Sequence, residues 1–449
     1  MTPLIISAIA AVSSLHEPSC RQYHGLLKAD VLAAIPDHDL VEGRPLDPEL
    51  GIGVEEITAA CIASAWLGGE EAFTLARLAR WWALEYLRHY DLNTHGPYGN
   101  RTLTLGEALT ILPPFRNIEH SVKVRIWLES YVVEAQQCFI LDREPMAAEQ
   151  TPAQYCESLR TVHSSKTGVL LASGLPSGSA ARLSQPDRQL IGHAGLLEIL
   201  LAVRRFERMH NMNAAQMLGA QIDRQLQGDH TRQRILQISG AMEALDRWQE
   251  RCRDDEDLSA ATPSSMDLTF TYVLARAYIG SQALSIPINS SAPSSGGPQV
   301  VAQTCSSSIK ASVVNLAKEA ASMALDLACE KKGRGFADRI VAMPTWYHFM
   351  LGQVVGFLVQ LVQRKNRFLL AREARTILNK VEIFVQLHIF EINLHAYQAP
   401  SHHFTGPVSS ETAEPTCRPP PPGAGRHPAS STAEMMARAL AHVKAQSKG

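Results

Sequence analysis

Residues 121–145 read SVKVRIWLESYVVEAQQCFILDREP and contain the clearest helical pattern in the chain. Apolar side chains recur every three or four positions along it: Val124, Trp127, Leu128, Tyr131, Val132, Ala135 and Phe139. This spacing places them on one face of a helix with about 3.6 residues per turn. Pro145 has no amide hydrogen to donate, so we expect the helix to end before it. The stretch predicts a buried helix over Ser121–Leu141.

Two more helices are predicted upstream, over Glu55–Leu67 and Glu70–Tyr90. Both carry apolar or small residues at helical spacing, and the second has a broad apolar stripe. Gly68-Gly69 stands between them and supplies the backbone freedom that a tight connection requires. The pair therefore predicts a helical hairpin.

The same periodicity continues toward the C-terminus. It predicts helices over Gln189–Met209, Arg234–Arg253, Leu268–Leu284, Ile309–Cys329, Pro344–Leu361 and Glu373–Tyr397. Two stretches rich in small residues and proline, Ser164–Pro186 and Asn289–Pro298, are predicted to be loops. We find no segment with the alternating pattern of a strand. The sequence therefore predicts an all-α fold, a large irregular helical bundle.

The composition changes sharply at Ala399. We predict one helical domain over residues 1–398 and a Pro-rich disordered tail over residues 399–449, with a run of prolines at Pro419–Pro422. Thr432–Ala445 has the pattern of a short amphipathic helix within that tail. Two apolar stretches, Thr2–Leu15 and Phe349–Val362, are too short or too interrupted to cross a membrane. We expect both to be core helices of a soluble, intracellular protein with no membrane contact.

Charge and cysteine spacing exclude several classes of site. The formal net charge of the 449 residues is −2, so no basic field favours binding to phosphates, and direct DNA contact is doubtful. Eight cysteines are present, but none lies within a C-x-x-C pair, which zinc fingers and zinc clusters require. We expect reduced thiols that are mostly buried.

Motifs for catalysis and cofactor binding are incomplete. Ser164–Thr167 lacks the upstream glycines of a phosphate-binding loop, and Gly174–Gly178 places its serine one position too late for a nucleophile elbow. His388 and His395 share a helix face with Glu391 between them, near His402 and His403, but no spacing supplies a convincing third metal ligand. We predict no catalytic, cofactor-binding or metal-binding residue and no cofactor.

The order of the helices resembles the regulatory region of fungal zinc-cluster transcription factors. Residues 2–11, Glu56–Leu67 and Ala72–Leu92 are similar to its opening helices. Arg125-Ile126-Trp127, Tyr131, Glu134 and Asp142-Arg143-Glu144-Pro145 are similar to its Arg-Leu-Trp helix and the Gly-Arg-Pro that follows, with Asp142 in place of glycine and Glu144 inserted. Three later segments follow in the same order: 244–248, 272–278 and 343–347. The resemblance covers roughly residues 1–398.

This resemblance implies a nuclear regulator of transcription that controls a fungal metabolic or biosynthetic gene set. The family places a six-cysteine zinc cluster before this region, and this sequence opens inside the regulatory helices. We therefore expect either that the cluster is encoded upstream or that DNA is reached through a DNA-binding partner. Contacts with the transcription machinery, a small-molecule effector and a homodimer are further expectations. Arg125, Trp127, Arg143 and Trp248 are the residues we expect to hold the bundle together.

Two alternatives remain open. An all-α enzyme of the cyclase type would use acidic clusters to hold magnesium, and Asp254–Asp257 is the one candidate. A charge run between helices is more commonly a solvated loop, and no second acidic motif accompanies it. The other alternative is a helical scaffold protein without a regulatory role.

Overall fold

The computed structural model confirms the all-α fold: the described residues form helices and no strands. These residues are 1–17, 19–33, 52–90, 119–147, 151–161, 183–217, 224–254, 263–286, 298–329, 340, 342–364 and 370–396. The predicted tail and its short helix lie outside them.

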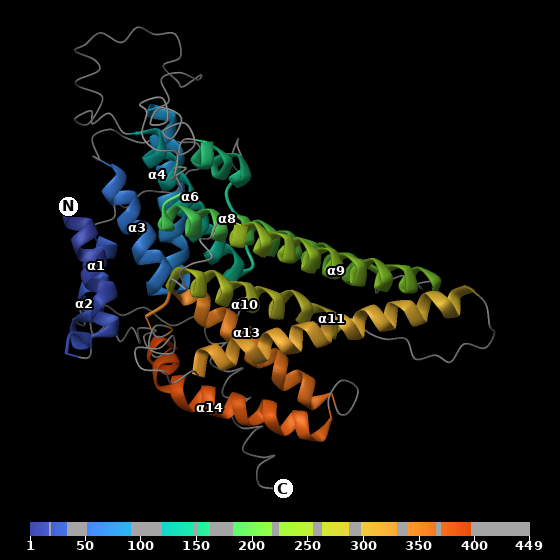
Figure 1. Ribbon diagram of the computed structural model, residues 1–449. Helices are drawn as coiled ribbons and strands as arrows, with labels where there is room; N and C mark the ends of the chain where they lie inside the picture. The colour runs from blue at the N-terminus through green and yellow to red at the C-terminus, as the bar shows by residue number, and fades with distance from the viewer. Residues whose placement is uncertain are drawn as a thin grey trace, which may run out of the picture.

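The helices follow one another along the chain as Figure 1 labels them. Their bounds are α1 Pro3–His16, α2 His24–Ala33, α3 Val54–Leu67, α4 Gly69–Tyr90, α6 His120–Leu141, α8 Gln185–Met217, α9 Arg224–Asp254, α10 Pro263–Ser285, α11 Pro298–Cys329, α13 Thr345–Gln363 and α14 Ala371–Ala396. A short helical stretch also covers residues 152–161.

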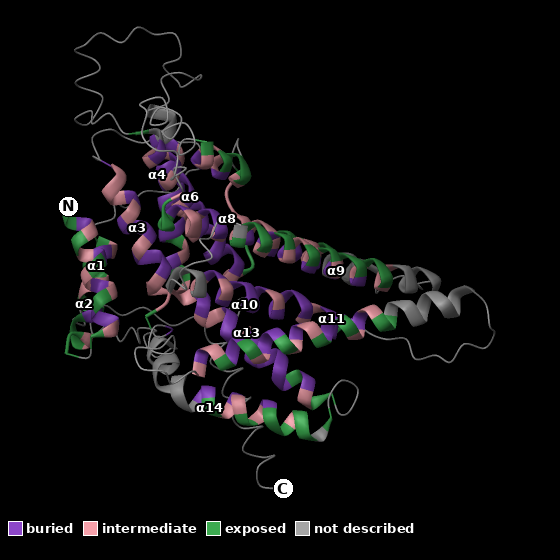
Figure 2. Ribbon diagram, in the orientation of Figure 1, coloured by how far each residue is buried: buried purple, intermediate pink, exposed green. Residues whose placement is uncertain are grey.

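Neighbouring helices pack in a continuous series. The pair α1–α2 lies against α3, which packs on α4 and α6. Helix α6 also packs on α8, and α10 contacts α8, α9, α11 and α13. Helices α8, α9 and α11 extend to one side, and α14 lies along α11 and α13 (Figure 1). Helices α4, α6, α10 and α13 are rich in buried residues, which are shown in purple in Figure 2.

Helix α13 is the central helix of the bundle. By length and composition alone it could cross a membrane, but it contacts α3, α6, α10, α11 and α14 inside the protein. Trp346, Met350 and Val355 are at most 1% exposed. This agrees with the prediction of a core helix over Phe349–Val362, because neighbouring helices cover its apolar surface.

The connection between α3 and α4 also follows the prediction. Gly68 and Gly69 adopt positive φ angles of 68° and 78°, which side-chain-bearing residues rarely adopt. The chain can therefore reverse within two residues, and α3 and α4 pack as the predicted hairpin. A third left-handed residue is Asp142, which ends α6 at φ 56° and ψ 46°.

Gly280 allows α10 and α11 to pack closely against each other. A Cβ atom added to Gly280 would lie 2.6 Å from Cβ of Ala317 and 3.2 Å from the carbonyl oxygen of Val313. Both distances are shorter than a normal contact, so the two helices meet at this point with no room for a methyl group. Three alanines of α11, at 317, 321 and 324, are fully buried.

Four helices extend at least four residues beyond their predicted ranges; one of them is α10, which begins at Pro263 and not at Leu268. Helix α8 begins at Gln185 and continues to Met217, α9 begins at Arg224, and α11 begins at Pro298. Each of these helices extends beyond its apolar stripe, so apolar periodicity underestimates the length of the helix. The predicted loops at Ser164–Pro186 and Asn289–Pro298 are wrong at their last residues, because Pro186 lies in the first turn of α8 and Pro298 starts α11.

Candidate functional site: a buried ion pair and a charged junction

A fully buried ion pair joins α4 to α6. Arg80 and Glu134 are 1% and 0% exposed, and Nε of Arg80 lies 3.6 Å from Oε2 of Glu134. Two charges removed from water in this way require close partners, because their desolvation costs several kcal/mol each. Burial lowers the pKa of Arg80 to about 10, which still leaves it a cation at neutral pH.

Aromatic rings surround the arginine. Its guanidinium lies 3.9 Å from the ring centre of Trp127 and 5.6 Å from that of Tyr131. Trp127 also stacks on Tyr155, with 3.8 Å between ring centres. Nη1 of Arg80 donates to the Trp127 carbonyl oxygen at 3.0 Å and to Ser130 Oγ at 3.3 Å. The cation therefore has a ring contact as well as hydrogen bonds, which favours its charged form.

Glu134 connects the pair to the segment that follows α6. Its Oε1 accepts hydrogen bonds from Nη1 of Arg77 at 3.2 Å and from the backbone amide of Met146 at 2.8 Å. Burial raises the pKa of Glu134, while Arg80, the Met146 amide and Arg77 oppose that rise. One carboxylate thus holds α4, α6 and residues 142–147 together.

The segment 142–144 is bound on one side by α8. Its first residue, Asp142, carries a carboxylate that lies 3.3 Å from Nε of Arg204 and 3.7 Å from Nε of Arg208. Arg204 also donates to the Phe139 carbonyl oxygen at 2.5 Å and lies over the Phe139 ring. Glu144 pairs with Arg205 at 3.0 Å and with Arg208.

The same segment is bound on the other side by α4. Nη2 of Arg143 lies 3.0 Å from a carboxylate oxygen of Glu70, and its guanidinium is 4.3 Å from the ring centre of Phe73. We call residues 142–144, Glu70 and the arginines 204, 205 and 208 the charged junction. It contrasts with the buried pair because its side chains are partly exposed, as the 44% and 48% exposure of Arg143 and Glu70 shows.

A second link between α6 and α8 involves Arg125. Its Nε and Nη2 donate to the two carboxylate oxygens of Asp187 at 2.6 and 2.9 Å. Asp187 is 1% exposed, and this two-pronged geometry is the strongest that an arginine and a carboxylate form. Glu129 lies one turn from Arg125, and burial raises its pKa, while Arg125 lowers it and Asp187 raises it further.

We expect Glu129→Gln to stabilise the protein at neutral pH, by on the order of 1 kcal/mol or less. A carboxyl whose pKa is raised by folding contributes stability below its unfolded pKa, and loses it as pH rises through the folded value. The amide mimics the protonated form, so the gain should be present at pH 7 and absent near pH 4. Urea unfolding of both proteins at the two pH values measures it, and an equal gain at both would contradict this explanation.

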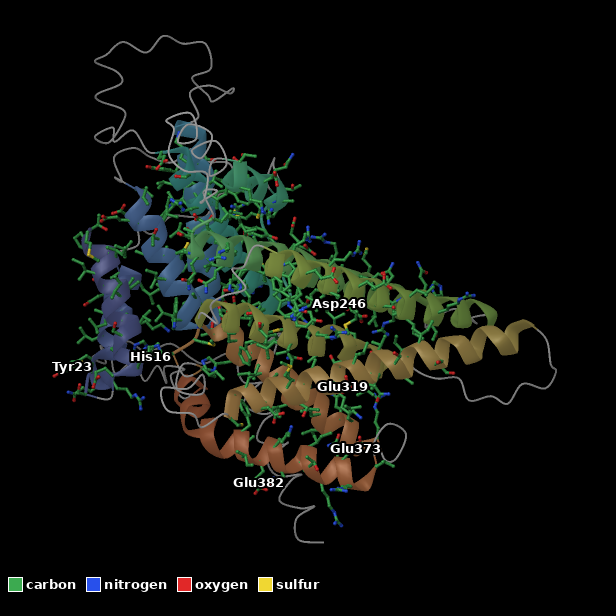
Figure 3. All side chains as sticks on the ribbon, viewed as in Figure 1. His16, Tyr23, Asp246, Glu319, Glu373 and Glu382 are labelled. Carbon is green, nitrogen blue, oxygen red and sulfur yellow. The ribbon has the colours of Figure 1, made fainter. Side chains whose placement is uncertain are left out.

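Trp248 links α9 to α8 and lies close to a second polar cluster. It is 3% exposed, and its indole nitrogen donates to the carbonyl oxygen of Gly192 at 2.9 Å. Asp246, labelled in Figure 3, accepts hydrogen bonds from the Tyr272 hydroxyl at 2.6 Å and from Nη1 of Arg276 at 2.7 Å. These contacts attach α9 to both α8 and α10.

The four residues expected to hold the bundle together therefore occupy different environments. Trp127 and Trp248 are buried in the core, whereas Arg125 and Arg143 are partly exposed and bridge helices. Among the described arginines the buried one is Arg80, which was not among these four. The sequence indicates only weakly that Arg80 is buried: it lies in an apolar helix, with alanines at positions 76 and 83 on the same face.

Three buried cysteines, at positions 61, 138 and 156, are poor nucleophiles. Burial raises the pKa of Cys138 to about 12 and that of Cys156 to about 11, and it also raises the pKa of Cys61. A thiol with such a pKa is protonated at neutral pH, and only the thiolate attacks substrates or binds metals. Among the described side chains, no group of three or more His, Cys, Asp or Glu residues is placed to hold a metal ion.

Several segments considered in the sequence analysis lie outside the described residues. They are Ser164–Thr167, Gly174–Gly178, residues 255–257 of the acidic run, His402 and His403; for His388, Glu391 and His395 only the helical backbone is described. No protein-family model, curated protein or solved structure matches this chain.

Proposed function

We propose that this chain is the helical regulatory domain of a nuclear transcription regulator that controls a fungal metabolic or biosynthetic gene set. The proposal rests on one observation. The most telling segment of the resemblance, Lys123–Pro145, provides Arg125, Glu134 of the buried pair and residues 142–144 of the charged junction. It thus connects α6 to both α4 and α8. Its polar residues are therefore used for interhelical contacts.

The two sets of charges differ in how easily they break. The charged junction consists of partly exposed ion pairs, each of which contributes about 0–1 kcal/mol. The buried pair costs several kcal/mol to disrupt when one partner is lost. A regulatory domain needs weak contacts that can change, such as those of the charged junction. It also needs strong contacts that keep the helices folded, such as the buried pair. We propose that the part of α8 that carries Arg204, Arg205 and Arg208 shifts against residues 142–144, while α4 and α6 stay together and Arg125–Asp187 holds the start of α8 on α6.

An effector or partner protein would act by binding one packing of α8 more tightly than the other. The net charge of −2 gives no support to direct DNA binding by this chain. DNA would then be reached through a zinc cluster in the same protein or through a DNA-binding partner. The transcription machinery is the other partner that this function requires.

We expect the full chain, fused to a heterologous DNA-binding domain in a fungal host, to change reporter expression relative to that domain alone. Arg205→Glu/Arg208→Glu should alter this output roughly fivefold or more, because it opposes both contacts of Glu144 with α8. Arg247→Glu is the matched control, since Arg247 is exposed on α9 outside the junction. Chromatin immunoprecipitation of the tagged chain provides a second readout.

A reporter that responds to neither the wild-type fusion nor the junction variant, together with no promoter occupancy, would exclude this function. An equal response to the junction variant and to Arg247→Glu would retain the regulatory function but remove the junction from its mechanism. Protein levels are to be compared in each strain, so that loss of folding is not read as loss of regulation.

A further inference from the structure

Two histidines from neighbouring helices face each other between α8 and α9. His210 is on α8 and His230 is on α9, and their ring centres are 6.2 Å apart with the rings inclined at 66°. Phe206 precedes His210 by one turn, and the centres of the two rings are 6.1 Å apart, so Phe206 packs beside the His210 ring. The pair joins the C-terminal part of α8 to the N-terminal part of α9.

The charges around this pair are mostly positive. Arg234 follows His230 by one turn on α9, and its Nε donates to Glu207 Oε1 at 3.1 Å. Nη2 of Arg234 binds the other oxygen of Glu207 and donates to Ser285 of α10 at 3.2 Å. Glu207 is 8% exposed and raises the pKa of His210. Its carboxylate is already paired with Arg234.

We propose that His210 and His230 form a pH-responsive joint between α8 and α9, in which protonation of His210 separates this part of α8 from α9. Protonation of His210 adds a second cation next to Arg234, and Glu207 is the carboxylate beside them among the described side chains. Like charges at this distance repel, and the repulsion is stronger where the site is partly removed from water.

The direction of the His210 pKa agrees with this geometry. Burial lowers it first, Arg234 lowers it next, Glu207 opposes the change, and His230 lowers it slightly. The folded protein therefore binds this proton more weakly than the unfolded chain does. Such a group contributes stability above its unfolded pKa near 6.5, and that stability is lost as pH falls through the lower folded value. The effect is thus expected below about pH 6.5.

Hydrogen exchange of the full chain tests the joint directly. Exchange is compared at pH 7.5 and 5.5 after correction for the intrinsic chemical rate. We expect the opening of residues 204–217 and 224–238 to increase roughly threefold or more on acidification, while residues 345–363 of the central helix α13 do not change. His210→Gln should reduce that increase because glutamine cannot be protonated, and His230→Gln should reduce it because His230 is one of the groups that lower the pKa of His210.

His193→Gln is the matched control. His193 is also on α8, but its Nε2 lies 3.4 Å from a carboxylate oxygen of Asp267. This variant should retain the full response of residues 204–217. The proposal is overturned if wild-type exchange is the same at both pH values, if both glutamine variants of the pair keep the whole increase, or if His193→Gln abolishes it. The proposal does not rest on the regulatory function, and its readout requires no reporter.

Discussion

Glu134→Ala is expected to lower the free energy of unfolding by about 3–5 kcal/mol, the largest effect of any substitution considered for this chain. The change removes the carboxylate but leaves Arg80 buried as a cation at 1% exposure. It also leaves the amide of Met146 without its acceptor and removes one contact of Arg77. Urea unfolding followed by circular dichroism measures the loss.

Two further proteins make this result specific. The double variant Arg80→Met/Glu134→Leu removes both charges and should cost less than Glu134→Ala alone, because no uncompensated charge stays in the core. Asp326→Ala breaks an exposed pair with Lys380, 2.7 Å apart, and should cost less than about 1 kcal/mol. If Glu134→Ala costs no more than Asp326→Ala, the buried pair does not have the structural role described here.

Gly280→Ala is expected to destabilise the protein by about 1–3 kcal/mol, the usual cost of overpacking a close helix contact. The added methyl group would meet the Cβ of Ala317 and the backbone of Val313, neither of which can rotate away. Helices α10 and α11 would have to separate along the length over which they pack.

The same substitution at Gly240 should have the opposite sign. Gly240 lies inside α9, and no atom lies within 4 Å of an added Cβ. Alanine favours a helix over glycine by about 0.5–1 kcal/mol, so Gly240→Ala should raise the midpoint of thermal unfolding. Equal effects of the two variants would show that local helix propensity, and not the α10–α11 contact, determines the outcome.

The fold class and most helices could be predicted from the sequence because apolar periodicity is a local property. The helices α3, α4, α6, α13 and α14 follow their predicted ranges to within about two residues at each end, whereas α10 begins at Pro263 and not at the predicted Leu268. The errors at the ends of α8, α9 and α11 have one physical cause. Residues 224–233 of α9, for example, are mostly polar, so they show no stripe although they are helical.

The candidate site was much less predictable. Arg80 and Glu134 are 54 residues apart in the chain, and a helical pattern does not show which helix faces which. The segment 142–145 was singled out by resemblance, but no sequence pattern identifies its arginine partners on α8. In the structure, Arg204 and Arg208 bind Asp142, and Arg205 binds Glu144. Long-range pairing of charges requires the tertiary structure.

The central position of α13 also affects how the protein can be synthesised. Thr345 at its start donates to the carbonyl oxygen of Ala65, and the indole of Trp66 donates to the carbonyl oxygen of Ala342. The partners Ala65 and Thr345 are 280 residues apart, which is on the order of 15–60 s of translation at ~5–20 residues per second. Helices α3 and α6 therefore leave the ribosome with an apolar face uncovered, and the nascent chain must be protected from aggregation until α13 emerges.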